Sequence, residues 1–64
     1  MNVYVVEEHE RYEGGAVLGV FTSIRRAKKL YHETDAPTRS DMVTIVEYPT
    51  NGGPGSLILS KVGS

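Results

Sequence analysis

The sequence contains no cysteine, which excludes disulfide bonds and thiolate metal sites. Its two histidines, His9 and His32, are too few for a conventional structural zinc site without carboxylate ligands. No stretch approaches the roughly 20 consecutive apolar residues that span a bilayer, and no basic region followed by an apolar core marks a signal peptide. We therefore expect no metal site, no cofactor, no membrane association and a cytoplasmic location.

A strong charge of either sign is also missing. Seven basic and eight acidic side chains leave a net charge of −1, which argues against a generic nucleic-acid coat and a polybasic membrane binder. The 64 residues make one domain, expected over residues 1–62 with a frayed tail at 63–64. A chain this short buries only roughly 60% of its unfolded surface and needs a further source of stability. With disulfide bonds and thiolate metal sites excluded, oligomerisation is the source of stability that remains.

The first half of the chain reads as a strand, a glycine turn, a second strand and a helix. β-branched and aromatic residues are typical of the two strands, and a hydroxyl at Thr22 or Ser23 offers a helix N-cap. Gly19, in the middle of the second strand, indicates a bulge or a close approach by the helix. The expected bounds are Asn2 to Glu8 and Ala16 to Thr22 for the strands, His9 to Gly15 for the loop, and Ile24 to Glu33 for the helix.

The second half adds two strands. Thr34 to Pro37 ends the helix, because proline and the residue before it disfavour helical conformation. Strands are expected from Met42 to Tyr48, stopped by Pro49, and from Ser56 to Val62, with a loose glycine turn between them. The predicted fold class is α+β: a small antiparallel sheet in the order ββαββ, with one helix packed on one face.

One helix covers one face of such a sheet, yet both faces carry apolar side chains. An antiparallel sheet with a solvated face normally places polar residues there, and a contiguous apolar patch usually marks an interface. Partial cover by loops and the fourth strand is one explanation. We favour packing on another chain, most simply as a symmetric homodimer. The candidate sheet interface is Tyr4, Val6, Leu18, Val20, Val46 and Tyr48.

Four basic residues cluster in the first half of the predicted helix: Arg25, Arg26, Lys28 and Lys29. The helix macrodipole prefers negative charge at that end, so the placement suggests a partner. A solvated face, pairing with the acidic first strand and its loop, and contact with phosphates or an acidic protein all remain open. We take these four as the candidate partner-binding residues.

No catalytic constellation emerges from the sequence. His9 lies between Glu8 and Glu10 without further expected metal ligands, and no nucleophile elbow surrounds any serine. The glycine pairs at 14–15 and 52–53 lack the lysine and hydroxyl of a phosphate-binding loop. Turn formation explains both. We therefore predict that the protein is not an enzyme.

Several short motifs resemble a group of short uncharacterised phage and bacterial proteins. The motifs are Val3-Tyr4-Val5-Val6, Tyr12-Glu13-Gly14-Gly15, Leu18 to Ser23 and the Ala27-Lys28 helix. The similarity covers roughly Met1 to Leu30, with Val43 to Tyr48 loosely. It implies a hairpin, a helix and a further strand, and an accessory protein of a phage or mobile element, without an activity or site to carry over.

The leading prediction is a non-enzymatic, homodimeric protein-binding module that occupies the surface of a host or other protein, in an accessory or inhibitory role. The alternative is a nucleic-acid-binding protein that uses the basic helix.

Overall fold

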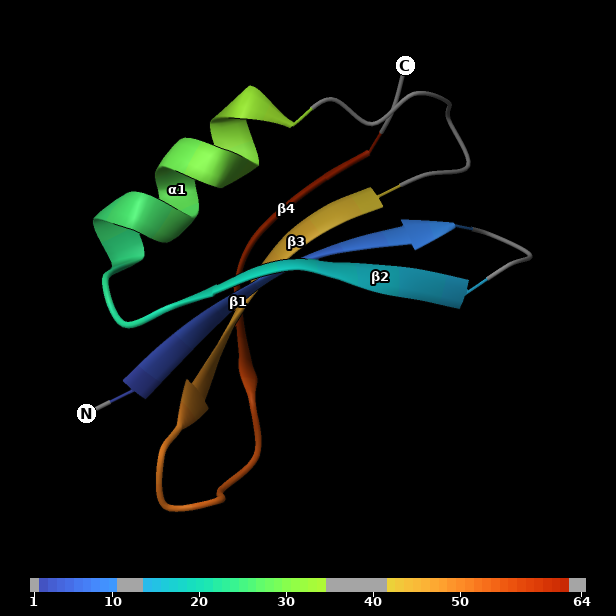
Figure 1. Cartoon of the computed structure of the whole chain (residues 1–64). Coiled ribbons are helices and arrows are strands. Elements are labelled where there is room, and N and C mark those ends of the chain that lie inside the picture. The colour runs from blue at the N-terminus through green and yellow to red at the C-terminus, as the bar shows by residue number, and fades with distance from the viewer. Residues whose placement is uncertain (1, 11–13, 35–41, 63–64) are drawn as a thin grey trace.

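The computed structural model describes residues 2–10, 14–34 and 42–62. Its elements are β1 (Asn2–Glu10), β2 (Gly14–Phe21), α1 (Ile24–Glu33), β3 (Met42–Pro49) and β4 (Ser56–Val62). The strands form one antiparallel sheet in the order β2-β1-β3-β4, and α1 lies across one of its faces (Figure 1). The predicted α+β class and the ββαββ order are confirmed. The expected tail at 63–64 and the helix-ending residues 35–37 lie outside the described residues.

The first hairpin is longer than the sequence predicts. The predicted bounds of α1 and β4 are those of the structure, but the expected loop from His9 to Gly15 is wrong at both ends. His9 pairs with Gly15 and Glu10 with Gly14, where the backbone has a positive φ of 81° that glycine adopts without strain. Pairing with a neighbouring strand therefore overrides the low strand propensity of these charged and glycine residues.

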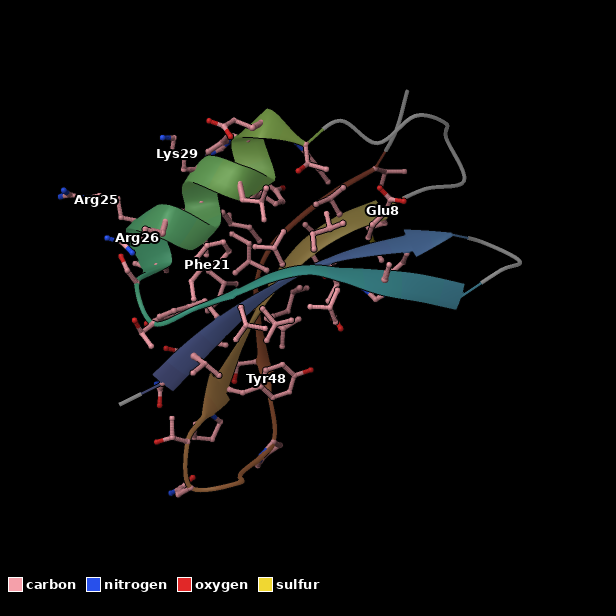
Figure 2. All side chains as sticks on the ribbon, in the orientation of Figure 1. Glu8, Phe21, Arg25, Arg26, Lys29 and Tyr48 are labelled. Atoms are coloured by element: carbon pink, nitrogen blue, oxygen red, sulfur yellow. The ribbon has the colours of Figure 1, made fainter. Side chains whose placement is uncertain are left out.

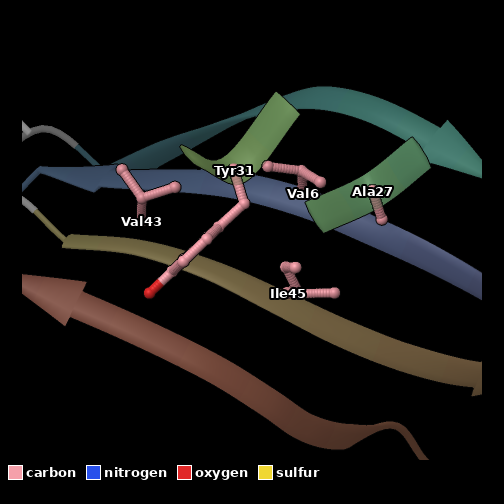
Figure 3. Close-up of a cluster of buried hydrophobic side chains, with 5 residues drawn as sticks. All are labelled: Val6, Ala27, Tyr31, Val43 and Ile45. Atoms are coloured by element: carbon pink, nitrogen blue, oxygen red, sulfur yellow. The ribbon is translucent and has the colours of Figure 1, made fainter. Parts of the chain in front are cut away.

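The core lies between α1 and the two central strands. Val6 of β1 is the partner of Ile45 of β3, and both side chains are fully buried against the helix. The other core residues are Ala27, Tyr31 and Val43 (Figure 3). Ala27 and Tyr31 lie four residues apart and therefore share the helical face that packs on the sheet.

The two ends of α1 are held differently. Ser23 is the N-cap, which confirms one of the two predicted positions, but its hydroxyl does not make the expected capping hydrogen bond. The first turn is closed by the backbone alone, with the Ala27 amide donating to the Ser23 carbonyl at 3.1 Å. At the C-terminus the Thr34 hydroxyl donates to the Leu30 carbonyl at 2.8 Å. The helix is therefore secured mainly at its C-terminal end.

Lys61 of β4 is a second tie at this end of the helix. Its ammonium group donates to the Tyr31 carbonyl at 2.7 Å and lies 4.7 Å from the centre of the Tyr31 ring. A cation at a helix C-terminus is favoured by the macrodipole, and the lysine is a second donor to a carbonyl that also accepts from the Thr34 amide at 3.4 Å. The half-buried lysine thus links the edge strand β4 to α1 across the core.

The substitution Lys61→Met should destabilise the fold by about 1 to 2 kcal/mol, because it keeps the apolar stem but removes the charged hydrogen bond and the contact with the ring. Urea denaturation measures the change. Lys28→Met, at an exposed helix position, is the matched control and should change stability by less than about 0.5 kcal/mol. Equal effects of the two substitutions would contradict the role given to Lys61.

Candidate functional site

The face of the sheet opposite α1, here called the open face, is the largest candidate surface. Every large hydrophobic side chain that is strongly exposed in the described residues lies on it by strand register or alternation. These side chains are Val17, Leu18, Val20, Met42, Leu57 and Val62, with exposed fractions from 37% to 65%. A surface this rich in apolar side chains is atypical of a solvated sheet face.

Four of the open-face residues form a continuous line across the sheet. Val20 pairs with Val5, Val5 with Val46, and Val46 with Leu57, so the line crosses β2, β1, β3 and β4 in turn. We call it the apolar row. Its outer members Val20 and Leu57 are 60% and 62% exposed, and its inner members are half-buried. Val3 and Tyr48, a neighbouring cross-strand pair, extend it on one side.

Bulges widen the apolar surface at the sheet edges. In β2, Gly19 pairs with Val6 and Val17 with Glu7, which leaves Leu18 as the additional residue. Two consecutive residues, Val17 and Leu18, therefore both face away from the helix, as expected at a β-bulge. The prediction that Gly19 marks a bulge or a close approach is confirmed in both respects: a Cβ there would lie 2.7 Å from the Phe21 ring and 3.0 Å from Leu30.

The predicted sheet interface mixed the two faces. Leu18, Val20, Val46 and Tyr48 do lie on the open face, where Figure 2 shows Tyr48 pointing away from α1. Val6 is instead fully buried under the helix, and Tyr4 packs against the same core. The grouping was wrong for these two because even-numbered residues of β1 lie opposite odd-numbered residues of β3, a register that the alternation within each strand does not reveal.

The loop after β3 covers part of the open face. A Cβ on Gly55 would lie 2.5 Å from the Tyr48 ring and 2.8 Å from Val46, so the ring packs directly on the glycine backbone. Both side chains are half-buried as a result. This is the partial cover that the sequence left open, and it stops short of Val20 and Leu57, at the two ends of the apolar row.

A polar group interrupts the open face on the other side of the apolar row. The Nε2 atom of His9 lies 3.2 Å from the Thr44 hydroxyl and 3.7 Å from a Glu7 carboxylate oxygen. Thr44 is buried beneath this group. The polar group therefore divides the open face: the apolar row lies on one side of Thr44, and the exposed cross-strand pair Met42 and Val62 lies on the other.

Tyr4 and Glu47, opposite each other on the helix face, form a separate polar pair. A hydrogen bond to the Glu47 carboxylate, partial burial and the negative charge of that carboxylate raise the pKa of the Tyr4 hydroxyl above its ordinary value of 10.0. The Asn2 side-chain amide also donates to Glu47, at 3.0 Å. These contacts join the N-terminal end of β1 to β3.

The substitution Glu47→Gln should lower the pKa of Tyr4 toward 10.0, measured by NMR titration of its ring resonances. Because the folded-state pKa is raised, the stabilisation linked to Tyr4 is fully present below the unfolded pKa and is lost as pH rises through the folded pKa. Stability should therefore fall with pH above about 10, and less steeply in a Tyr4→Phe control. An unchanged Tyr4 titration in Glu47→Gln would contradict the assignment.

The four candidate basic residues are exposed, but they do not share one direction. Figure 2 shows Arg25, Arg26 and Lys29 projecting from α1 away from the sheet. With about 3.6 residues per turn, Arg26 points toward one flank of the helix and Lys28 toward the other. No ion pair joins any of the four to an acidic residue of the described segments. Their charge is therefore available to a partner.

A shallow groove lies beside α1, and the sequence analysis did not identify it. It is lined by Phe21, Arg26, Lys29, Leu30 and Glu33 and has a volume of about 350 Å³. Phe21 and Leu30 are half-buried and pack against the core, whereas the three charged residues are exposed. The i, i+3, i+4, i+7 spacing of the four helical residues was a signal for a shared face, but only the fold places Phe21 next to them.

Among residues 2–10, 14–34 and 42–62, no three histidine, aspartate or glutamate side chains are grouped as ligands for a metal ion, and no helix is both long and apolar enough to cross a bilayer. Comparison of the chain with protein-family models, curated proteins and solved structures finds no match. The resemblance of Met1 to Leu30 to short phage and bacterial proteins therefore stays a prediction.

Proposed function

We propose that this protein is a non-enzymatic protein-binding module whose open face packs against a second copy of the chain in a symmetric homodimer. The observation that carries the proposal is the apolar row, which exposes Val20 and Leu57 at its two ends and spans all four strands. In a two-fold dimer each row lies on its counterpart, as in the face-to-face packing of sheets about 10 Å apart.

The area of the open face is compatible with such a dimer. Four strands about 4.8 Å apart, each about 25 Å long, present roughly 500 Å² per copy, or about 1,000 Å² for the pair. This reaches the lower size of specific protein interfaces, about 1,000 Å² in total. Burial of the exposed valine and leucine side chains would add stability at about 25 cal/mol per Å² of apolar surface.

The distribution of charge also favours the open face as the dimer interface. The four basic residues of α1 lie on the other side of the sheet, so a dimer through the open face brings none of them together. The helix stays exposed in the dimer and free for a host or other partner protein.

We extend the proposal to the setting in which the module acts. The motif resemblance of the first half of the chain supports an accessory or inhibitory protein of a phage or mobile element, and this part rests on that analogy alone. The cysteine-free composition is compatible with a reducing cytoplasm, which we take as its location.

Binding to nucleic acid is the second candidate, and the charges of Arg25, Arg26, Lys28 and Lys29, which form no ion pair with a described acidic residue, favour it. Affinity for DNA or RNA through these residues would fall steeply with salt, because each neutralised phosphate releases counterions. The net charge of −1 and the divergent directions of Arg26 and Lys28 make this candidate weaker than protein binding.

The substitution Val20→Lys should convert the dimer to a monomer, because it places a charge at one end of the apolar row. Light scattering coupled to size-exclusion chromatography should give twice the 7.0 kDa chain mass for the native protein and the single mass for the variant. Since Val20 is 60% exposed, the monomer fold should persist, as measured by circular dichroism.

The matched control is His32→Lys, which adds a lysine at an exposed position of α1. It should remain dimeric. A native protein that stays monomeric throughout a concentration series, or a Val20→Lys variant that stays dimeric, would contradict the proposed dimer face.

A further inference from the structure

The edge strand β2 lacks the usual protection against pairing with another strand. Among the described strands it pairs only with β1, so no other described strand pairs with the second side of its backbone. Its eight residues, Gly14–Phe21, include no lysine, no proline and no charged residue of any kind, although these commonly block sheet edges. The bulge at Leu18 is the one protective feature. By contrast, the other edge strand, β4, carries Lys61.

The groove beside α1 opens next to the C-terminal end of this edge. Phe21, the last residue of β2, forms its floor together with Leu30 of the helix. The Phe21 ring lies across Gly19, where a Cβ would come within 2.7 Å of it. A strand added to β2 would run about 4.8 Å from it. Its side chains on the helix side would then point into the groove.

The rim of the groove is basic at the end near the start of α1. Arg26 and Lys29 are exposed and make no ion pair with a described acidic residue, and Arg26 lies in the first turn, at the positive end of the helix dipole. Glu33 lies at the opposite end of the groove, one helical turn beyond Lys29. The charge along the groove thus changes from positive beside Phe21 to negative at Glu33.

We propose that β2 and this groove bind an extended acidic peptide segment of a partner protein. The segment pairs with the free edge of β2, an apolar side chain occupies the groove over Phe21 and Leu30, and a carboxylate lies against Arg26 and Lys29. Edge-strand addition supplies affinity through main-chain hydrogen bonds, and the pockets for alternate side chains supply specificity.

Charge decides between this occupant and a second copy of the chain. If two β2 edges paired about a two-fold axis, the added strand would bring no carboxylate to Arg26 and Lys29, because β2 contains no charged residue. An acidic segment supplies that complementary charge. The peptide would bind a surface distinct from the open face. Peptide binding and the proposed dimer can therefore each fail independently of the other.

A displayed library of extended peptides of about ten residues, long enough to pair along the whole of β2, is the first probe. Selection on the intact native protein should enrich peptides that combine an excess of Asp and Glu with one large apolar residue. Hydrogen exchange should show new protection of the Gly14–Phe21 amides when the most enriched peptide is bound.

Charge reversal at the rim is the decisive comparison. Fluorescence anisotropy with that peptide should show affinity at least about tenfold weaker for Arg26→Glu/Lys29→Glu. The control Arg25→Glu/Lys28→Glu makes the same charge change on the same helix outside the groove, and should weaken binding by less than about threefold. Both pairs are exposed, so both variants should keep the fold by circular dichroism.

Three outcomes would overturn the inference. The native protein would enrich no peptides beyond those that the Arg26→Glu/Lys29→Glu variant enriches, or the enriched peptides would carry no excess of Asp and Glu. Alternatively, both charge-reversal variants would lose the same amount of peptide affinity. Equal loss, together with binding of labelled single-stranded DNA that disappears at high salt, would indicate a nucleic-acid surface instead. The variant Leu57→Lys, at the β4 end of the apolar row and outside both β2 and the groove, separates this test from the proposed dimer, because peptide affinity should be unchanged whether or not the native protein dimerises.

Discussion

The packing of α1 on the two central strands is the contact on which the rest of the structure depends. Ten helical residues bury Val6 and Ile45 at the centre of the sheet, through Ala27 and Tyr31. A helix of this length cannot also cover the opposite face, and the chain has no second helix within its described residues. The asymmetry of the molecule, with a closed face and an open face, follows from this single contact.

The bulges adapt the sheet to that helix. One register shift falls directly after Val6, between β1 and β2, and another directly after Ile45, between β3 and β4. Both flank the central core pair, and each places an additional residue, Leu18 or Ile58, on an edge strand. Bulges increase local twist, and Figure 1 shows β2 and β4 diverging strongly. The central strands thus stay close to α1 while the edges turn away.

Apolar and charged surfaces are separated by the thickness of the molecule. The open face carries the apolar row and a small polar group, whereas the exposed side of α1 carries four basic residues that form no ion pair with a described acidic residue. Lys61, the basic residue of β4, is the exception, since its charge is used within the fold against the C-terminus of α1. This separation gives the molecule an apolar surface on one side and a basic surface on the other.

The sequence by itself determined the elements and their order, because helix and strand periodicity are local properties: Ile24–Glu33 and Ser56–Val62 match the prediction at both ends. It also identified the basic helix and the excess of apolar strand residues. Only the tertiary structure decided which residues share a face. That depends on the register between β1 and β3 and on the bulge at Leu18, which are set by pairing between distant segments. For the same reason Tyr4 and Val6 belong to the helix side, and Phe21 meets Arg26 and Lys29 in a groove that no local pattern contains.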